Sequence, residues 1–226
     1  MTHVLHLDSS ARRAGSVSRQ LGEESLAQWL VREPDLDIVY RDLDAEPPPF
    51  VNDTWVSAAF SPPEGHDRSL RFALSRSELL IRELEVADVL LIGAPMYNFG
   101  IPAALKAWID QVVRLGRTFH YEGPVPVGLV HGKHAIVLAT SGGNSGQYEL
   151  AGLDFRTSYL RAILGFMGIT SVEVVSVVDT MSGHADLAAA RAEFGAVLDR
   201  QALHVPAQTE PVAVTPMAEG PAATHT

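Results

Sequence analysis

Short apolar runs alternate with helical patterns along the chain. The runs cover residues 3–8, 37–42, 87–93, 134–140 and 172–178. Between and after them, apolar residues recur at intervals of three and four, which predicts helices over 18–33, 67–84, 102–115, 155–167 and 185–204. Strands that alternate with helices are typical of βα units around a parallel sheet that is covered on both faces. The pattern therefore predicts a three-layer α/β domain with a doubly wound sheet of five parallel strands in the order 2-1-3-4-5.

Two segments do not fit this repeating pattern. Residues 44–63 are rich in Asp and Pro, and the run from Pro47 to Pro49 forbids a helix and disfavours a sheet at that place. Residues 205–226 are rich in Pro, Ala and Thr without periodicity, which predicts a disordered tail. Because 226 residues favour one α/β domain over two, we expect one domain over residues 1–204 and a tail over 205–226.

Charge and composition exclude several classes of partner. Seventeen basic and 27 acidic residues give a net charge of -10, which repels a phosphate backbone, so nucleic acid is not expected as a partner. The chain has no cysteine, which excludes a disulfide framework, a thiolate metal site and a cysteine nucleophile. Asp8 comes too early for a signal-peptide core, and no apolar run approaches the roughly 18 residues of a membrane span. We therefore expect a cytoplasmic protein with no membrane partner.

The stretch after the third strand, APMYNFGIPAALKAWIDQVVRL over residues 94–115, is the most informative part of the chain. In the order 2-1-3-4-5 the loops after strands one and three meet at the carboxyl ends of the strands, where such sheets bind ligands. An aromatic, amide-bearing loop at this place indicates recognition of a flat group. In the helix over 102–115, Leu105, Trp108, Ile109 and Val112 form one apolar stripe. This stripe packs on the sheet or, if part of it is exposed, holds a second subunit.

The first loop, SSARRAGSVSR over residues 9–19, places hydroxyl groups before a helix. Hydroxyls and free backbone N–H groups at a helix start suit a phosphate, because the helix dipole and the donors act on the same oxygen atoms. The spacing matches neither GxGxxG nor the Walker pattern, so a terminal monophosphate fits better than a dinucleotide. A plain helix cap by Ser16 or Ser18 is the alternative.

The fourth loop, ATSGGNSG over residues 139–146, allows two interpretations. Adjacent glycines let the backbone approach the edge of a planar ring system closely. The alternative is a serine hydrolase with Ser141 as nucleophile, because the sequence is close to the GxSxG elbow. The nearest acid and histidine, Asp179 and His184, lie only five residues apart in one loop, which disfavours a triad.

Residues 116–123, GRTFHYEG, form a long loop after the helix of the central stretch. Phe119 and Tyr121 in this loop could form an apolar lid over the binding crevice, or could simply cover the core. His120, His131 and His134 have no convergent carboxylate near them in the sequence, so we expect no metal site.

Taken together, these loops resemble the flavodoxin-like, FMN-dependent NADH azoreductases and quinone reductases. The resemblance spans residues 4–178 in unbroken order, and its most specific part is PMYNFGIPAALKAWIDQVVRLGRTF. The motifs that carry it are Ser10 with Ser16-Val17-Ser18, Pro95-Met96-Tyr97-Asn98-Phe99, Leu105-Lys106, Thr118-Phe119-His120-Tyr121, and Thr140-Ser141-Gly142-Gly143.

The resemblance implies a role for each of these loops. The FMN phosphate would be bound by Ser10, Ser16, Val17 and Ser18; the isoalloxazine ring would be lined by Pro95, Met96, Tyr97, Asn98 and Phe99; and its other edge would be closed by Thr140, Ser141, Gly142 and Gly143. The substrate pocket would include Phe119, Tyr121 and Ile163. Tyr121 would face the substrate, and Ile163 stands where the family often has an aromatic residue, which would widen the pocket. The family is homodimeric with flavin sites at the subunit interface, which agrees with a dimer contact through Trp108 on the helix over 102–115.

The activity implied is two-electron transfer from NADH or NADPH through FMN to a quinone or azo compound. Both substrates would use the same flavin face in turn, giving ping-pong kinetics. Recognition of a 2′-phosphate would need an arginine, and the candidates are Arg12, Arg13, Arg19 and Arg117. The alternatives are a flavodoxin-type electron carrier, a serine hydrolase, and an α/β binding module without enzymatic activity.

Overall fold

The computed structural model describes residues 1–143, 152–182 and 185–202. Its main sheet has five parallel strands in the order β2-β1-β3-β6-β7, which confirms the predicted order, β6 and β7 being its fourth and fifth parallel strands. The strands are β1 (His3–Asp8), β2 (Asp37–Asp42), β3 (Val89–Pro95), β6 (His134–Thr140) and β7 (Ser171–Val177). All seven residues of the central strand β3 are buried, as expected for a parallel strand with a helix layer on each face.

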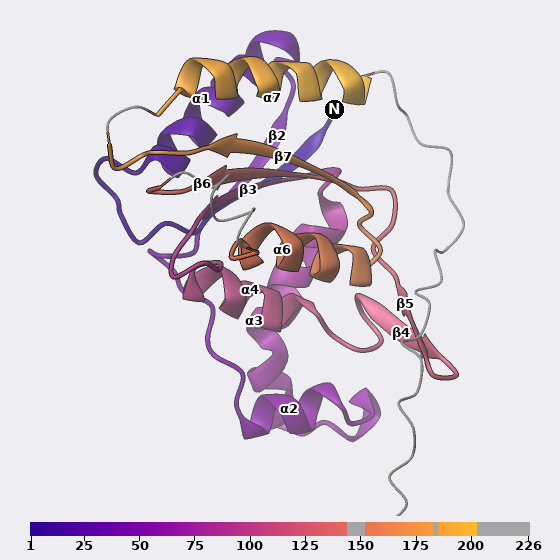
Figure 1. Cartoon of the computed structure of the whole chain (residues 1–226). Coiled ribbons are helices and arrows are strands. Elements are labelled where there is room, and N and C mark those ends of the chain that lie inside the picture. Colours follow the sequence, from indigo (N-terminus) through magenta and orange to yellow (C-terminus); the bar gives the residue numbers. More distant parts are fainter. Residues whose placement is uncertain (144–151, 183–184, 203–226) are drawn as a thin grey trace, which may run out of the picture.

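Helices cover both faces of the sheet (Figure 1). One layer contains α1 (Val17–Arg32) and α7 (Leu187–Ala202), and the other contains α3 (Arg68–Val86), α4 (Ala103–Val112) and α6 (Phe155–Phe166). Successive residues of β3 alternate between the two cores: Leu90 packs with the layer of α4, and Leu91 packs with the layer of α1. Each predicted helix is present with ends shifted by a few residues. Residues 203–204 of the last predicted helix and the predicted tail over 205–226 lie outside the described residues.

The proline-rich segment 44–63 contains a helix that the sequence did not predict. This helix, α2 (Asp53–Ala59), begins after the prolines, where the side chain of Asn52 caps its first turn. A single 3-10 turn, η1 (Pro63–Gly65), follows it. Trp55 of α2 is buried and donates its Nε1–H to Oε1 of Gln111 at 2.9 Å. The segment is therefore attached to α4.

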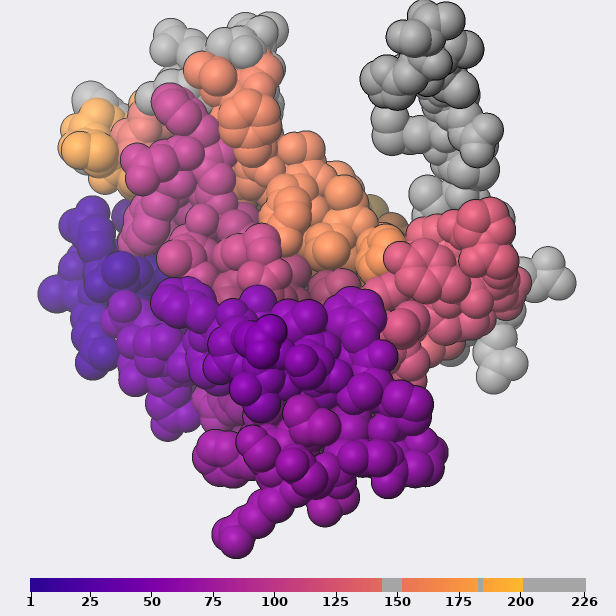
Figure 2. Space-filling view, turned by 90° about the horizontal axis from the view of Figure 1, so that it is seen from below, coloured from indigo at the N-terminus to yellow at the C-terminus, as the bar shows by residue number. Residues whose placement is uncertain are grey.

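The lid interpretation expected residues 116–123 to form a loop over the carboxyl ends of the strands, and the structure contradicts it. These residues lead into an antiparallel hairpin of β4 (Phe119–Glu122) and β5 (Val125–Gly128). The hairpin is anchored near the amino ends of β6 and β7, because Val130 N–H donates to the carbonyl of Met167 at 2.8 Å and the Phe119 ring lies 4.7 Å from that of Phe166. We call this end of the sheet the amino edge. Figures 1 and 2 show the hairpin projecting from the body of the molecule.

The apolar stripe of α4 packs inside its own chain. Trp108 and Val112 are fully buried, in one core cluster with residues of the sheet, α3 and α6. The large Trp108 is accommodated because α4 packs on the sheet with α3 and α6 on either side of it in the same layer (Figure 1). The expected subunit contact through Trp108 and Val112 is therefore wrong: neither side chain has a surface to offer a second subunit.

Among the described residues, no helix combines the length and the apolar character needed to span a bilayer.

Candidate functional site

Three loops predicted to form the site lie at the carboxyl edge of the sheet, where β1, β3 and β6 end. The strands end nearly level, since Asp8 pairs with Gly93 and Pro95 pairs with Thr140. Met96, directly after β3, donates its N–H to the carbonyl of Thr140 at 2.8 Å. The structure thus brings together the serine loop, the Met96 to Phe99 loop and the Gly-Gly loop.

The first loop ends at the start of α1. Ser16 caps this 16-residue helix, its hydroxyl oxygen accepting from the Arg19 N–H at 3.5 Å, and lies 3.2 Å from the Ser18 hydroxyl. Gly15 adopts a φ of 66°, a left-handed conformation that favours glycine and turns the chain into the helix. Hydroxyls that gather at the start of a long helix suit a phosphate, because the first N–H groups and the helix dipole attract negative charge.

The sequence allowed Arg19 to bind a 2′-phosphate, but in the structure this arginine lies beneath the first loop and its guanidinium is already bound. Its guanidinium makes two hydrogen bonds to Asp42, at 2.9 and 2.7 Å, and donates to the main-chain carbonyls of Ser10 at 2.8 Å and Arg12 at 3.2 Å. Burial alone would raise the pKa of Asp42, but the hydrogen bonds and charge of Arg19, together with the backbone N–H groups of Ala45 and Asp44, hold that pKa below its usual value. Arg19 therefore ties the first loop to the end of β2.

Three further polar side chains lie against this cluster. Asp8 accepts a hydrogen bond from the Tyr40 hydroxyl at 2.9 Å, and its burial raises the pKa of its carboxyl group. Burial, together with the Asp8 charge, raises the pKa of Tyr40 to about 12. His6 lies on the same strand as Asp8, and its burial lowers its pKa to about 4.

The loop after β3 is a tight two-residue turn. Tyr97 and Gly100 exchange both backbone hydrogen bonds at 3.0 Å, and the two residues between them, Asn98 and Phe99, have φ values of 49° and 66°. These values fit a type I′ turn, which tolerates Asn well but is unfavourable for Phe. The turn leaves Phe99 41% exposed at the carboxyl edge. A strained residue that exposes an aromatic ring is the kind of feature found at ligand sites.

The hydroxyl of Tyr97 joins the first and second loops. It lies 3.2 Å from the Ser10 hydroxyl and accepts from the N–H of Ala11 at 3.2 Å. The loop predicted to bind the phosphate and the loop predicted to line the ring are therefore directly connected.

The Gly-Gly loop after β6 is held by the loop after β7, which the sequence did not assign to the site. Thr180 and Met181 donate their N–H groups to the carbonyls of Ser141 and Gly142, at 3.1 and 3.3 Å. A Cβ atom at Gly142 would lie 2.7 Å from Sδ of Met181, the end of an exposed and flexible side chain that packs beside this loop. The Ser141 hydroxyl donates to the Gly143 carbonyl at 2.8 Å rather than to a histidine, which removes support for a serine nucleophile. His184, the other member of that alternative, and residues 144–146 of this loop lie outside the described residues.

A buried ion pair lies behind the second and fourth loops. Arg156, 2% exposed, donates from Nη1 to the carbonyls of Ala94 at 3.2 Å and Thr140 at 2.8 Å, and from Nη2 to Asp154 at 3.1 Å. Asp154 also caps α6, and the next N–H, that of Phe155, donates to the Phe99 carbonyl at 3.0 Å. The start of α6 thus holds both loops at the carboxyl edge. Nothing in the sequence around Arg156 distinguished it from a surface residue of a helix.

The remaining predicted residues lie away from this edge within one chain. Phe119 and Tyr121 are on the hairpin at the amino edge, and Tyr121 is 54% exposed. Ile163 lies eight residues after the start of α6, roughly 12 Å along the helix, and is partly buried against the core. Arg117 is bound to Glu78 and to Glu85 on α3, so it cannot serve the carboxyl edge of its own chain. Of the arginines considered for a 2′-phosphate, Arg12 and Arg13 are the two on an exposed part of the first loop.

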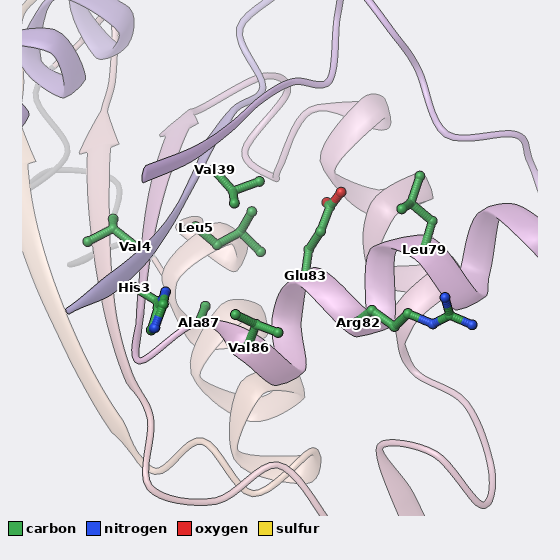
Figure 3. Close-up of a pocket in the computed structure, with 9 residues that line it drawn as sticks. All are labelled: His3, Val4, Leu5, Val39, Leu79, Arg82, Glu83, Val86 and Ala87. Atoms are coloured by element: carbon green, nitrogen blue, oxygen red, sulfur yellow. The ribbon is translucent and has the colours of Figure 1, made fainter. Parts of the chain in front are cut away.

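A separate apolar hollow lies at the amino edge (Figure 3). Its volume is about 190 Å³, and side chains of Leu5, Val39, Leu79 and Val86 line it. None of the predicted site residues contributes to it. This hollow is too small for a cofactor, since cofactor sites typically enclose roughly 300–1,000 Å³.

Comparison with known proteins relates the chain to one family. A family model described as a flavodoxin-like fold matches residues 2–200. The FMN-dependent NADH:quinone oxidoreductase of Nostoc punctiforme is 42% identical over 196 residues, which cover 85% of this chain and 96% of that protein. FMN-dependent NADH:quinone oxidoreductase 3 of Pseudomonas aeruginosa is 45% identical over 175 residues, covering 77% and 81%. The crystal structure of an azoreductase from Bacillus anthracis superposes with a TM-score of 0.80 at 28% identity, covering 88% of this chain and all of that one.

Proposed function

The chain belongs to the family described as a flavodoxin-like fold, and on that premise we propose that it is an FMN-dependent NADH:quinone oxidoreductase that also reduces aromatic azo compounds. Relatives that are 42% to 46% identical over most of the chain are FMN-dependent NADH:quinone oxidoreductases by name. The observation that carries the proposal is the convergence of the serine loop, the type I′ turn and the Gly-Gly loop at one edge of the sheet.

The residues at this edge fit FMN. Ser10, Ser16 and Ser18 provide hydroxyls beside the start of α1, which suits one terminal phosphate. The turn at Asn98 and Phe99 offers an aromatic ring and backbone amides, which suit a flat ring system with a polar edge. The Tyr97 hydroxyl connects the serine loop with the turn after β3, as expected if one ligand contacts both loops.

When bound, FMN supplies the chemistry by accepting a hydride equivalent from NADH and passing it to the acceptor. The share of the protein is binding and orientation. Ser16 and Ser18 would hold the phosphate, the Met96 to Phe99 turn would line the ring, and the Gly-Gly loop at Gly142 would close its other edge. No side chain at this edge has to act as a base, which agrees with the buried and paired state of the carboxylates there.

An absorbance titration tests the proposal. The purified protein, supplied with FMN, should show the two visible bands of a bound flavin, NADH should bleach them, and a quinone should restore them. Steady-state rates should give the parallel lines of ping-pong kinetics in double-reciprocal plots. Absence of binding would contradict the proposal, while binding without bleaching by NADH would identify a flavodoxin-type electron carrier.

We also propose that the working unit is a homodimer in a cytoplasmic location. The hairpin supports the dimer, because Tyr121 is exposed at the amino edge, away from the three loops of its own chain, and could approach such loops only on a second chain. The contact cannot use Trp108, which is fully buried. Tyr121→Phe should then change the preference among acceptors more than it changes FMN affinity. Dilution to monomer should release FMN; a monomer that keeps its flavin would contradict the shared site, and cell fractionation tests the location.

A further inference from the structure

Two arginines, the fully buried Arg156 and the largely buried Arg19, contact the main chain of the three loops. We propose that Arg19 and Arg156 are positioning residues that separately hold the two halves of the flavin site: Arg19 the loop for the phosphate, and Arg156 the loops for the ring. This inference rests on the proposed function. Neither arginine needs to touch the flavin, since each acts through main-chain carbonyl groups.

Arg19 fixes the direction of the first loop. Its side chain is 11% exposed, is held by Asp42 and lies 3.5 Å from Asp8, and it donates to the carbonyls of Ser10 and Arg12. In a trans peptide the N–H points away from the C=O, so a carbonyl turned toward Arg19 turns the next N–H to the opposite side. The N–H of Ala11 follows this rule, because it meets the Tyr97 hydroxyl at 3.2 Å. Without Arg19 the peptide units before α1 would lose the contact that sets their orientation.

Arg156 joins the ends of two strands in the same manner. One amino group of its guanidinium donates to the carbonyls of Ala94 and Thr140, and the Thr140 carbonyl also accepts from Met96. The carbonyl oxygen of Thr140, at the end of β6, thus accepts one hydrogen bond from the loop after β3 and one from α6. Asp154 balances the charge, and both side chains are almost completely buried, so the pair does not exchange its partners for water.

The two arginines belong to separate clusters. Arg19 contacts the first loop and the ends of β1 and β2, whereas Arg156 contacts the ends of β3 and β6 and the start of α6. The loops that they support are linked by the Tyr97 hydroxyl and by the Ser9 hydroxyl, which donates to the carbonyl of Gly93 at 2.6 Å, and neither arginine takes part in these two links. Effects of distant sites without shared partners are usually additive and separate. Loss of one arginine should therefore affect one half of the ligand.

Riboflavin, which is FMN without its phosphate, separates the two halves. We suggest measuring the dissociation constants of FMN and riboflavin by quenching of flavin fluorescence for the wild-type protein, Arg19→Gln and Arg156→Gln. Arg19→Gln should raise the dissociation constant of FMN roughly 10- to 100-fold, the range for a lost hydrogen bond to a charged group. It should leave the dissociation constant of riboflavin within about threefold of the wild-type value. Arg156→Gln should weaken both flavins by a similar factor of roughly 10 to 100. Arg200→Gln, on the exposed face of α7, removes the same charge and should change neither.

General destabilisation would weaken the binding of both flavins in both variants. Equal losses of FMN and riboflavin affinity in Arg19→Gln would therefore overturn the inference. An Arg156→Gln protein that binds riboflavin normally would also overturn it. Lysine at each position keeps the charge but not the fork of donors. If circular dichroism shows that a glutamine variant is unfolded, the lysine variant is subjected to the same criteria. A wild-type protein that binds no FMN would refute the proposed function instead, whereas normal wild-type binding with unaffected variants would refute this inference alone.

Discussion

Replacement of His6 by leucine should remove about 2 kcal/mol from the loss of stability that the apo-protein undergoes between pH 7 and pH 5. His6 lies on β1 with 1% of its surface exposed, and neither ring nitrogen has a hydrogen-bond partner among the described residues. Its Nε2 lies 3.7 Å from Asp8 Oδ1 and close to Gly22, where a side chain would approach it to 2.8 Å. The imidazole is therefore enclosed by protein and poorly placed to carry a charge.

The size of the effect follows from the pKa shift. Burial lowers the pKa of His6 from 6.5 to about 4; Glu23 opposes this shift and Arg19 adds to it. Between these pH values the unfolded chain binds the proton and the folded chain does not, so the free energy of unfolding falls as the pH falls from 6.5 toward 4. At about 1.4 kcal/mol per pH unit, the loss is about 2 kcal/mol between pH 7 and pH 5 and about 3 kcal/mol when pH 4 is reached. Asp8 acts in the opposite direction, because its raised pKa favours the folded state at low pH.

Urea unfolding followed by circular dichroism at several pH values between 7 and 4.5 measures this loss. The wild-type protein should become less stable across the range, and His6→Leu should lose about 2 kcal/mol less than the wild type between pH 7 and pH 5. Both proteins retain Asp8, so the difference isolates His6. His120→Asn, on the exposed hairpin, controls for removal of a histidine. An identical pH slope in wild type and His6→Leu would refute the reasoning.

Three further changes test other parts of the structure. Tyr97→Phe removes the hydroxyl that joins the loops at Ser10, and FMN affinity measured by fluorescence should fall about 3- to 10-fold with little change in thermal stability. Gly128→Ala places a Cβ atom 2.2 Å from the backbone after α6, so urea unfolding should show a loss of about 2 kcal/mol, whereas Gly65→Ala, with open space around it, should show none. Ser141→Ala should keep NADH-dependent quinone reduction within about threefold, because among the described residues its hydroxyl donates to Gly143 of its own loop; complete loss of activity would point to a nucleophile.

The sheet could be predicted because its strands are marked by continuous apolar runs. The predicted order of the five parallel strands is confirmed, and the site loops meet because parallel strands place their following loops at one edge. The third strand was predicted over 87–93 but extends over Val89–Pro95. The apolar run begins at the cap residue Ala87, directly after α3, so hydrophobicity alone placed the strand two residues early. Pro95 is accommodated as the last residue of the strand, and Met96 takes over the next hydrogen bond.

The hairpin and the subunit contact show where sequence patterns are insufficient. Pro126 lies within β5 and usually argues against a strand, but in a two-stranded sheet each strand is an edge, which tolerates proline. The subunit contact expected through Trp108 required that part of the apolar stripe be exposed. The burial of Trp108 depends on α3 and α6 packing beside α4 on the sheet, and a single helix pattern carries no information on that.

The supports of the site were also beyond the reach of sequence patterns. Arg156 acts on main-chain atoms of segments that are distant along the chain, such as Ala94, which is 62 residues away, whereas Arg19 acts on the nearby first loop. Their roles depend on side-chain directions in the folded protein. The motifs indicated which loops meet, while the contacts that hold them emerged only from the structure.

The separation of Tyr121 from the three loops has a genetic consequence. If each site takes its phosphate loop from one chain and its hairpin from the other, a mutation at Ser16 damages the phosphate loop that its chain contributes to one site. A mutation at Tyr121 damages the hairpin that its chain contributes to the other chain's site. Mixed pairs of the two products would contain one intact site, so co-expression should restore about half of the activity per mixed pair, although each allele alone is deficient. The position of the hairpin thus predicts intragenic complementation, which a site assembled within one chain does not show.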